Sequence, residues 1–202
     1  MARGKIQSIV DYVFSYPGIS NFIRFILEAG FAETKKTIKK ELDCNKKTLD
    51  IGCGTGTFSV LFKDYIGIDI SLRFIQYARK KYGREFYVGD TLKLEFSDNS
   101  FDNVLVVGVF HHLDDVKFLQ AISEIRRVLK KNGRALILED VPALPVNIIG
   151  KLVHKFDIGN NIRNMEGYQK LLKQELSLEK SYKIRNGIAD YGIFILFKDK
   201  SI

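Results

Sequence analysis

The chain has 202 residues, of which 46% are hydrophobic and 28% charged, and this composition excludes an intrinsically disordered protein. Its length suits one domain of ordinary size. The net charge of +8 raises nucleic acid or an anionic membrane surface as partners, but many cations fall at predicted helix ends, where they complement the helix dipole.

Residues 1–45 are predicted to form helices that act as a lid or cap on the rest of the domain. Beyond a break at Pro17-Gly18, six apolar residues can share one helix face: Ile19, Phe22, Ile23, Ile26, Leu27 and Phe31. We expect this face to pack on the sheet that follows; the alternative is a helix that lies on a membrane surface. No run approaches the ~18 apolar residues of a membrane-spanning helix, so we expect no transmembrane segment and at most peripheral membrane contact.

Residues 46–142 alternate short apolar runs with helical patterns, which is typical of βαβ units and a parallel sheet. The predicted strands are 48–51, 65–69, 85–90, 101–110 and 134–139. A helix is predicted over 116–129, with Asp114 as its N-cap. Cations before Gly83 and before Asn132-Gly133 mark two predicted helix C-termini.

Residues 143–202 are predicted to hold lid helices and a terminal β-hairpin, within the same single domain as the rest. Apolar runs at 181–185 and 189–197 flank Asn186-Gly187, and Asn-Gly between two such runs is a strong hairpin signal. We therefore expect the last two strands to be antiparallel neighbours, at the far end of the sheet from the strand at 85–88.

A glycine-rich stretch, LDIGCGTGTF, occupies positions 49–58 directly after the first predicted strand. Its spacing is G-x-G-x-G, whereas a dinucleotide fingerprint of the form G-x-G-x-x-G requires a glycine where this chain has Thr57. The spacing therefore argues against a nicotinamide-dependent oxidoreductase. Glycines at this point let the backbone approach a ligand where a Cβ would collide with it.

With Asp50 two residues ahead of the first glycine, the stretch resembles the first motif of class I S-adenosylmethionine-dependent methyltransferases. Two later stretches, DNSFDNVLVVGVFHHLDD and AISEIRRVLKKNGRALILE, resemble the small-molecule group that includes the ubiquinone and menaquinone biosynthesis enzymes. The resemblance covers residues 45–142. It implies a Rossmann-like, doubly wound α/β sheet of seven strands, mostly parallel, with helices on both faces and a reversed strand inserted between the fifth and sixth.

The resemblance also implies S-adenosyl-L-methionine as cofactor. Asp69 would accept hydrogen bonds from the ribose diol, and Asp90 from the adenine amino group. The complete expected cofactor site is Asp50, Gly52, Cys53, Gly54, Gly56, Asp69, Ile70, Asp90, Thr91 and Gly108. Cys53 is interpreted as a small side chain that a tight loop tolerates, rather than as a nucleophile.

His111 and His112 follow the fourth predicted strand, and either could act as general base for an acceptor hydroxyl or instead shape the loop through hydrogen bonds. Tyr12, Tyr16 and Arg163 are candidate acceptor contacts. We expect the acceptor to be a small, largely apolar or amphipathic molecule. This expectation rests on five phenylalanines placed near the pocket mouth: Phe14, Phe22, Phe25, Phe31 and Phe110. The alternative, an RNA-modifying methyltransferase or RNA-binding module, lacks a recognisable RNA-binding motif.

The numbers and spacing of cysteine and histidine residues bear on disulfides, cellular location and metal binding. The chain has only two cysteines, Cys44 and Cys53, so we expect no disulfide framework. A reducing cytoplasm is therefore the expected location. Polar residues interrupt any signal-peptide core in the first turns of the chain. Three histidines and two cysteines show no metal-ligand spacing, so no metal is expected.

Overall fold

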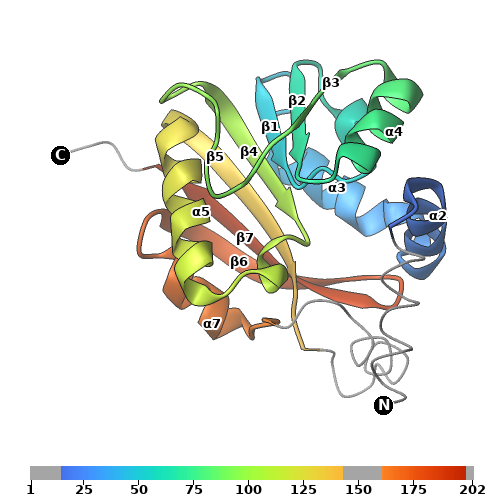
Figure 1. The fold of residues 1–202 in the computed structure, drawn as a ribbon. Helices are drawn as coiled ribbons and strands as arrows, with labels where there is room; N and C mark the ends of the chain where they lie inside the picture. Colours follow the sequence, from blue (N-terminus) through green and yellow to red (C-terminus); the bar gives the residue numbers. More distant parts are fainter. Residues whose placement is uncertain (1–14, 143–160, 199–202) are drawn as a thin grey trace, which may run out of the picture.

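Seven strands form a single sheet in the computed structural model, which describes residues 15–142 and 161–198 (Figure 1). The strands are β1 (Thr48–Ile51), β2 (Tyr65–Asp69), β3 (Glu85–Val88), β4 (Phe101–Val107), β5 (Leu129–Asp140), β6 (Ser177–Asn186) and β7 (Ala189–Phe197). Their order is β3-β2-β1-β4-β5-β7-β6. Strands β1 to β5 pair in parallel, whereas β7 runs antiparallel between β5 and β6. The mostly parallel sheet with a reversed C-terminal strand is therefore confirmed.

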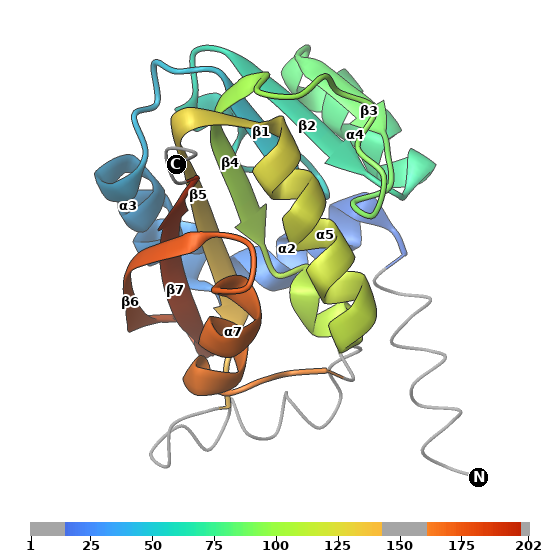
Figure 2. The same ribbon diagram turned by 90° about the vertical axis from the view of Figure 1, so that its left-hand side faces the viewer.

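Helices cover both faces of this sheet, as expected (Figures 1 and 2). They are α2 (Pro17–Leu27), α3 (Ala32–Glu41), α4 (Leu72–Tyr82), α5 (Asp115–Val128) and α7 (Met165–Leu172). Alternation along β4 divides the core into two layers, because successive side chains of a strand point to opposite faces. Val104 and Val106 pack with α5 and α7, whereas Leu105 and Val107 pack with α3 and α4.

Helix α5 agrees with the helix predicted over 116–129 to within one residue at each end, but the predicted C-terminal signal at Asn132-Gly133 does not mark its end. The Asp114 side chain caps its first turn by accepting a hydrogen bond of 2.9 Å from the Lys117 N–H. The helix ends at Val128, not at Asn132-Gly133, because the loop before β4 satisfies its last carbonyls: Ser100 N–H donates to Val128 O at 2.8 Å. Asn132 then takes a left-handed conformation, with φ of 64°, inside β5.

The expected packing of the α2 apolar face on the sheet is wrong for three of its six residues. Phe22 is 63% exposed, Ile26 60% and Ile19 48%, so these three face solvent, whereas Ile23 and Leu27 are half-buried and Phe31 is buried. The opposite, polar face of α2 turns inward and places Ser20, Asn21 and Arg24 on the wall of a pocket. Helical periodicity showed that α2 has two unlike faces, but it could not show which one the protein needs inside.

The tip of the β6–β7 hairpin holds the C-terminal end of α2. Ile188 N–H donates to Leu27 O at 2.9 Å, and Asn186 Oδ1 accepts from Glu33 N–H at 3.2 Å. The hairpin lies at the opposite edge of the sheet from β3, as predicted. Its two turn residues are Gly187 and Ile188, one position later than expected, because Asn186 pairs with Ala189 and its side chain is buried against the α2–α3 junction.

Replacing Gly187 with Ala is expected to destabilise the protein by about 2–5 kcal/mol. The position has a φ of 63°, and an added Cβ would lie 2.1 Å from Leu27 O, so left-handed strain adds to a clash with backbone. Gly83→Ala is the matched control, because Gly83 has a φ of 59° but open space around it, and we expect a loss of only about 1–2 kcal/mol. Urea denaturation of both variants measures the difference, and equal losses would contradict the close packing of the hairpin tip.

Candidate functional site

The loop after β1 is tight at one end and open at its centre. A Cβ on Gly52 would lie 2.3 Å from Val109 Cγ2, so the loop packs directly on the turn after β4. Gly54 has a φ of 52°, yet an added Cβ there would meet no protein atom within 4 Å. The backbone at Gly54 is therefore exposed to the pocket, where a ligand can approach it closely.

Asp69, at the end of β2, holds this loop in place. Its Oδ2 accepts a hydrogen bond of 2.9 Å from Gly54 N–H, and its Oδ1 accepts one of 2.8 Å from Ser71 N–H. Burial raises the pKa of the Asp69 carboxyl above its usual range, although both backbone hydrogen bonds oppose that shift. The carboxylate thus positions the loop, and its remaining lone pairs can still accept from a ligand.

Asp50 lies on the pocket wall and is almost completely buried, with 1% of its surface exposed. Tyr65 donates its hydroxyl to Asp50 Oδ2 at 2.7 Å. Burial raises the pKa of Asp50 to about 7, and the hydrogen bond from Tyr65 limits that rise. A carboxyl that is only partly ionised near neutral pH is suited to a cationic ligand, which would favour its charged form.

The polar face of α2 closes the pocket from the other side. Asn21 Oδ1 accepts hydrogen bonds of 2.8 Å from the hydroxyls of both Thr55 and Thr57 in the glycine loop. Arg24 donates its Nε to Glu28 Oε1 at 2.8 Å. The pocket is lined by Ser20, Asn21, Arg24, Phe31, Asp50, Gly52, Cys53, Gly54, Thr55, Thr57, Phe58, Phe74 and Val107.

The predicted cofactor residues after β2 and β3 lie outside this pocket. Ile70 is 75% exposed, and Asp90 is also exposed, with its Oδ1 accepting from Leu92 N–H at 2.9 Å. Asp90 lines a separate hollow beside β3 together with Tyr87 and Lys93. Thr91 Oγ1 is buried without a hydrogen-bond partner. The structure therefore brings together Asp50 with Gly52, Cys53 and Gly54, and leaves Asp90 in a neighbouring depression.

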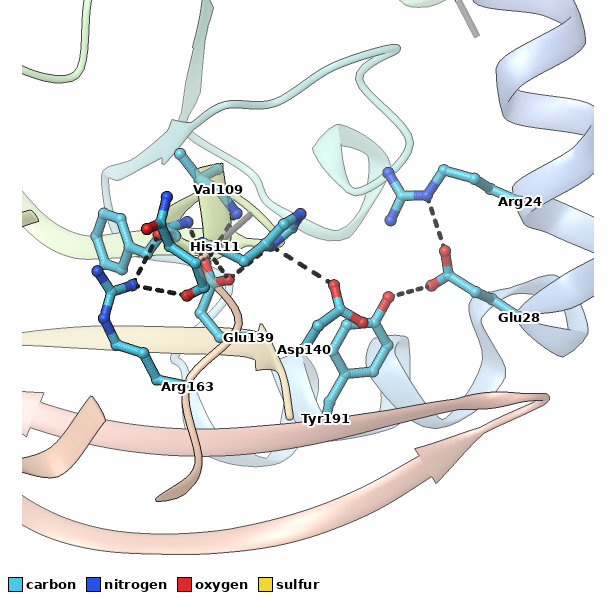
Figure 3. Close-up of polar contacts among 10 residues, drawn as sticks. Arg24, Glu28, Val109, His111, Glu139, Asp140, Arg163 and Tyr191 are labelled. Carbon is cyan, nitrogen blue, oxygen red and sulfur yellow. Dashed lines mark hydrogen bonds and ion pairs between the residues drawn. The ribbon is translucent and has the colours of Figure 1, made fainter. Parts of the chain in front are cut away.

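Glu139, which no sequence motif singled out, organises the turn after β4 (Figure 3). This fully buried carboxylate accepts backbone hydrogen bonds from Val109 at 2.8 Å, Phe110 at 2.7 Å and His111 at 3.2 Å. The His111 ring also contacts it, with 3.0 Å between Nδ1 and Glu139 Oε2. One sequence signal could have identified Glu139: it is an acidic residue at the end of an apolar run, and Asp140 follows it directly.

The two adjacent histidines have different surroundings. His111 is 5% exposed, and its Nδ1 lies 3.6 Å from Asp140 Oδ2 as well as against Glu139. Its ring packs beside Gly108, where an added Cβ would lie 3.6 Å from His111 Cε1. His112 is exposed. The structure thus places His111, and not His112, among the buried polar groups at the carboxyl edge of the sheet.

A second buried polar cluster joins α2 to the hairpin near this turn. Tyr191 donates its hydroxyl to Glu28 Oε2 at 2.9 Å, and Glu28 also binds Arg24. Figure 3 shows Asp140 between His111 and Tyr191, so polar side chains from α2, β5, β7 and the turn after β4 lie next to one another. None of Arg24, Glu28 and Tyr191 was predicted, because no local motif connects residues so distant in sequence.

Arg163 is part of the scaffold in this structure, not an open acceptor contact. Its guanidinium has five N–H donors, and five hydrogen bonds use them. Two go to Asp115 Oδ1, and the others to the carbonyls of Phe110, Leu113 and Asn161. Of the other candidate acceptor contacts, Tyr16 is 40% exposed at the start of α2, and Tyr12 lies outside the described residues.

The phenylalanines expected to line an apolar pocket mouth do not do so. Phe22 and Phe25 are exposed on the outer side of α2, and Phe110 is fully buried in the core beneath α5. Only Phe31 reaches the pocket, and Phe14 lies outside the described residues. For Phe22, Phe25 and Phe110 the expected role in the lining is therefore wrong, and the pocket walls combine polar side chains with Phe31, Phe58, Phe74 and Val107.

Burial also settles the chemistry of Cys53. It is 8% exposed, and burial raises the pKa of its thiol well above the usual range, so the sulfur is protonated near neutral pH. Among residues 15–142 and 161–198, no group of three or more His, Cys, Asp or Glu side chains could hold a metal ion. Within the same residues, no helix has the length and apolar composition that would let it cross a membrane.

A family model described as a methyltransferase domain matches residues 49–137. A demethylmenaquinone methyltransferase of Thermotoga maritima is 35% identical over 126 residues, which cover 58% of this chain and 54% of that protein. An uncharacterised protein of Methanocaldococcus jannaschii is 38% identical over 127 residues, which cover 58% of this chain and 53% of that protein. The chain thus spans about half the length of the curated relatives it matches.

The fold is also found among solved structures. A SAM-dependent methyltransferase of Thermotoga maritima superposes with a TM-score of 0.72, covering 93% of this chain and 99% of that chain at 22% identity. At this identity the similarity establishes the fold. The matched span of residues 49–137 contains the glycine loop, Asp69, Asp90 and the turn after β4.

Replacing Glu139 with Gln is expected to destabilise the protein by about 1–3 kcal/mol, because the amide presents N–H groups where three backbone N–H groups and an imidazole need an acceptor. Glu95→Gln is the control, since Glu95 is exposed and should change stability by less than about 0.5 kcal/mol. Thermal unfolding followed by circular dichroism compares the two. Equal stability of both variants would show that Glu139 does not hold the turn.

Proposed function

Because residues 49–137 match a methyltransferase-domain family model, we propose that the chain binds S-adenosylmethionine beside the loop after β1 and transfers its methyl group to a small molecule. The single observation that carries this proposal is the open backbone at Gly54 between two carboxylates. Asp50 lies in the pocket wall, and Asp69 is bonded to the Gly54 N–H. S-adenosylmethionine carries positive charge on its sulfonium and ammonium groups, so a pocket with accessible backbone and nearby carboxylates suits it.

The residues present fit the cofactor. Its ammonium and sulfonium groups are cations that the carboxylates of Asp50 and Asp69 favour, and its carboxylate suits the guanidinium of Arg24, which lines the same pocket. Asp69 keeps lone pairs for the ribose hydroxyls. Ile70, Asp90 and Thr91, at the ends of β2 and β3, would hold the adenine. When bound, the cofactor supplies an activated methyl group that needs only a correctly placed nucleophile.

His111 is the residue placed to accept a proton from an acceptor. Its Nδ1 faces Glu139 at 3.0 Å and Asp140 at 3.6 Å, which favours the tautomer with hydrogen on Nδ1 and leaves Nε2 as the base. The two carboxylates would stabilise the imidazolium that forms. The pocket would also align the methyl group with the nucleophilic atom of the acceptor. Holding two reactants at close range lowers the activation free energy by several kcal/mol.

A small acceptor suits the buried position of these groups. His111, Glu28 and Tyr191 are each no more than 5% exposed. A nucleobase of an RNA chain could reach them only by unstacking from its neighbouring bases. Arg24, on the pocket wall, favours an acceptor that carries a polar or negatively charged group of its own. Methylation of RNA is the competing function, and it predicts tight, salt-sensitive RNA binding.

Two measurements test the proposal together. Addition of S-adenosylmethionine should raise the melting temperature, whereas NAD should not, because only a ligand of the native state stabilises it. Filter binding with total cellular RNA should show no tight complex at about 150 mM salt. Stabilisation by NAD alone would contradict the cofactor assignment, and methyl incorporation into RNA would contradict the small-molecule acceptor.

Asp69→Asn is expected to weaken S-adenosylmethionine binding by about ten- to a hundredfold, because a charged acceptor becomes a neutral one at about 1.5–3 kcal/mol. The amide oxygen still accepts one backbone hydrogen bond, so the fold should persist with a somewhat looser loop. Calorimetric titration measures the affinity, and Asp64→Asn, at an exposed position just before β2, is the control. Unchanged affinity in Asp69→Asn would remove Asp69 from the cofactor site.

Binding of S-adenosylmethionine is expected to strengthen as the pH rises from about 6 to about 8. Asp50 has a pKa of about 7 in the free protein, and a bound cation favours its ionised form, so binding below pH 7 must release a proton. The affinity should change by up to about tenfold per pH unit below 7 and level off above it. Calorimetry in two buffers of different ionisation enthalpy measures the released proton.

The Asp50→Asn variant is the control for this pH dependence, and its affinity should vary little between about pH 6 and 8. In the free protein, the raised pKa of Asp50 means that its contribution to stability is greatest below about pH 4, falls as the pH rises from about 4 to about 7, and is constant above that. Asp50→Asn should remove that fall as well. A wild-type affinity that is flat across the range would show that Asp50 does not face the bound cation.

A further inference from the structure

The outer side of α2 carries an apolar stripe that no described residue covers. Ile19, Phe22 and Ile26 follow a spacing of three and four residues, which places them on one side of the helix. Their exposed fractions are 48%, 63% and 60%. Phe25, at 51%, extends the stripe toward the C-terminal end of α2, where its ring meets Phe31 edge-on. Large exposed apolar side chains gathered on one element mark an interaction surface.

Positive charge surrounds this stripe. Neither α2 nor α4 contains an acidic residue, and α4 holds Arg73, Arg79, Lys80 and Lys81. The two helices are neighbours: the Arg73 guanidinium lies over the Tyr16 ring at 6.0 Å, and Gly18 faces Tyr77. At the other end of α2, Lys35 lies over the Phe31 ring at 6.0 Å. Cations therefore stand at both ends of the apolar stripe.

We propose that α2 docks on an anionic lipid surface, with Phe22 and Ile26 entering the interface and Arg73 and Lys35 facing lipid phosphates. An apolar helix face bordered by cations is the arrangement with which peripheral helices bind such surfaces. Charge selects this occupant over a second copy of the chain, because two copies of a protein of net charge +8 would bring like charges together.

Docking would act on the helix that also lines the pocket. Asn21 and Arg24 lie on the inner face of α2, one turn or less from Phe22, so a surface that fixes the outer face also fixes the pocket wall. Lipid binding at this face depends on exposure and charge alone. It is independent of methyl transfer, since it needs no acceptor and no turnover.

Vesicle flotation tests the proposal. The full chain is mixed with vesicles of phosphatidylcholine alone or of phosphatidylcholine with phosphatidylglycerol, and the bound fraction is measured. The test variant is Phe22→Gln with Ile26→Gln, which keeps good helix formers at exposed positions. Val116→Gln is the matched control, because Val116 is 77% exposed on α5, away from α2. Circular dichroism confirms that each variant is folded.

We expect the wild type and Val116→Gln to float with phosphatidylglycerol vesicles and the double variant to bind at least tenfold more weakly. Binding should also weaken as salt increases, because charge contributes. Equal flotation of the double variant would overturn the proposal, as would equal binding to phosphatidylcholine alone. Absence of flotation, together with a dimer by light scattering that the double variant abolishes, would assign the stripe to a second copy of the chain.

Discussion

Two carboxylates, on the half-buried Asp69 and the fully buried Glu139, accept the backbone N–H groups that the loops at the carboxyl edge of the sheet leave unpaired. Asp69 fixes the loop after β1 through Gly54, and Glu139 fixes the turn after β4 through three successive residues. Backbone N–H groups that are buried without a partner raise the free energy of the folded state. By accepting them, these carboxylates allow loops without regular backbone pairing at this edge of the sheet. The pocket and the position of His111 both depend on this arrangement.

Local patterns predicted the sheet well because each pattern has a local cause. The runs at 48–51 and 65–69 became β1 and β2 without change, and the Asn186-Gly187 signal located the hairpin to within one residue. The turn moved because Asn186 bonds to Glu33, 153 residues away. No sequence window contains that contact, and it decided the register.

The site was predicted only where a motif carried it. Asp50 and the glycine loop lie together in one pocket, whereas the roles of Arg24, Glu139 and Tyr191 arise from contacts between distant segments. Arg163 is the opposite case: an arginine near the site suggested recognition, and five contacts with the protein itself use its donors. Residue type indicates what a side chain can bind, and only packing shows whether it is still available.

The contacts between α2 and the hairpin tip also order the events of folding. Glu28 meets Tyr191 across 163 residues, and Leu27 O meets the N–H of Ile188. During synthesis the segment that forms α2 leaves the ribosome early, yet the partners that hold it against the glycine loop come near the end of the sheet. Contacts of such long sequence separation form late. A nascent chain therefore cannot complete the pocket wall that α2 forms until the hairpin has been synthesised.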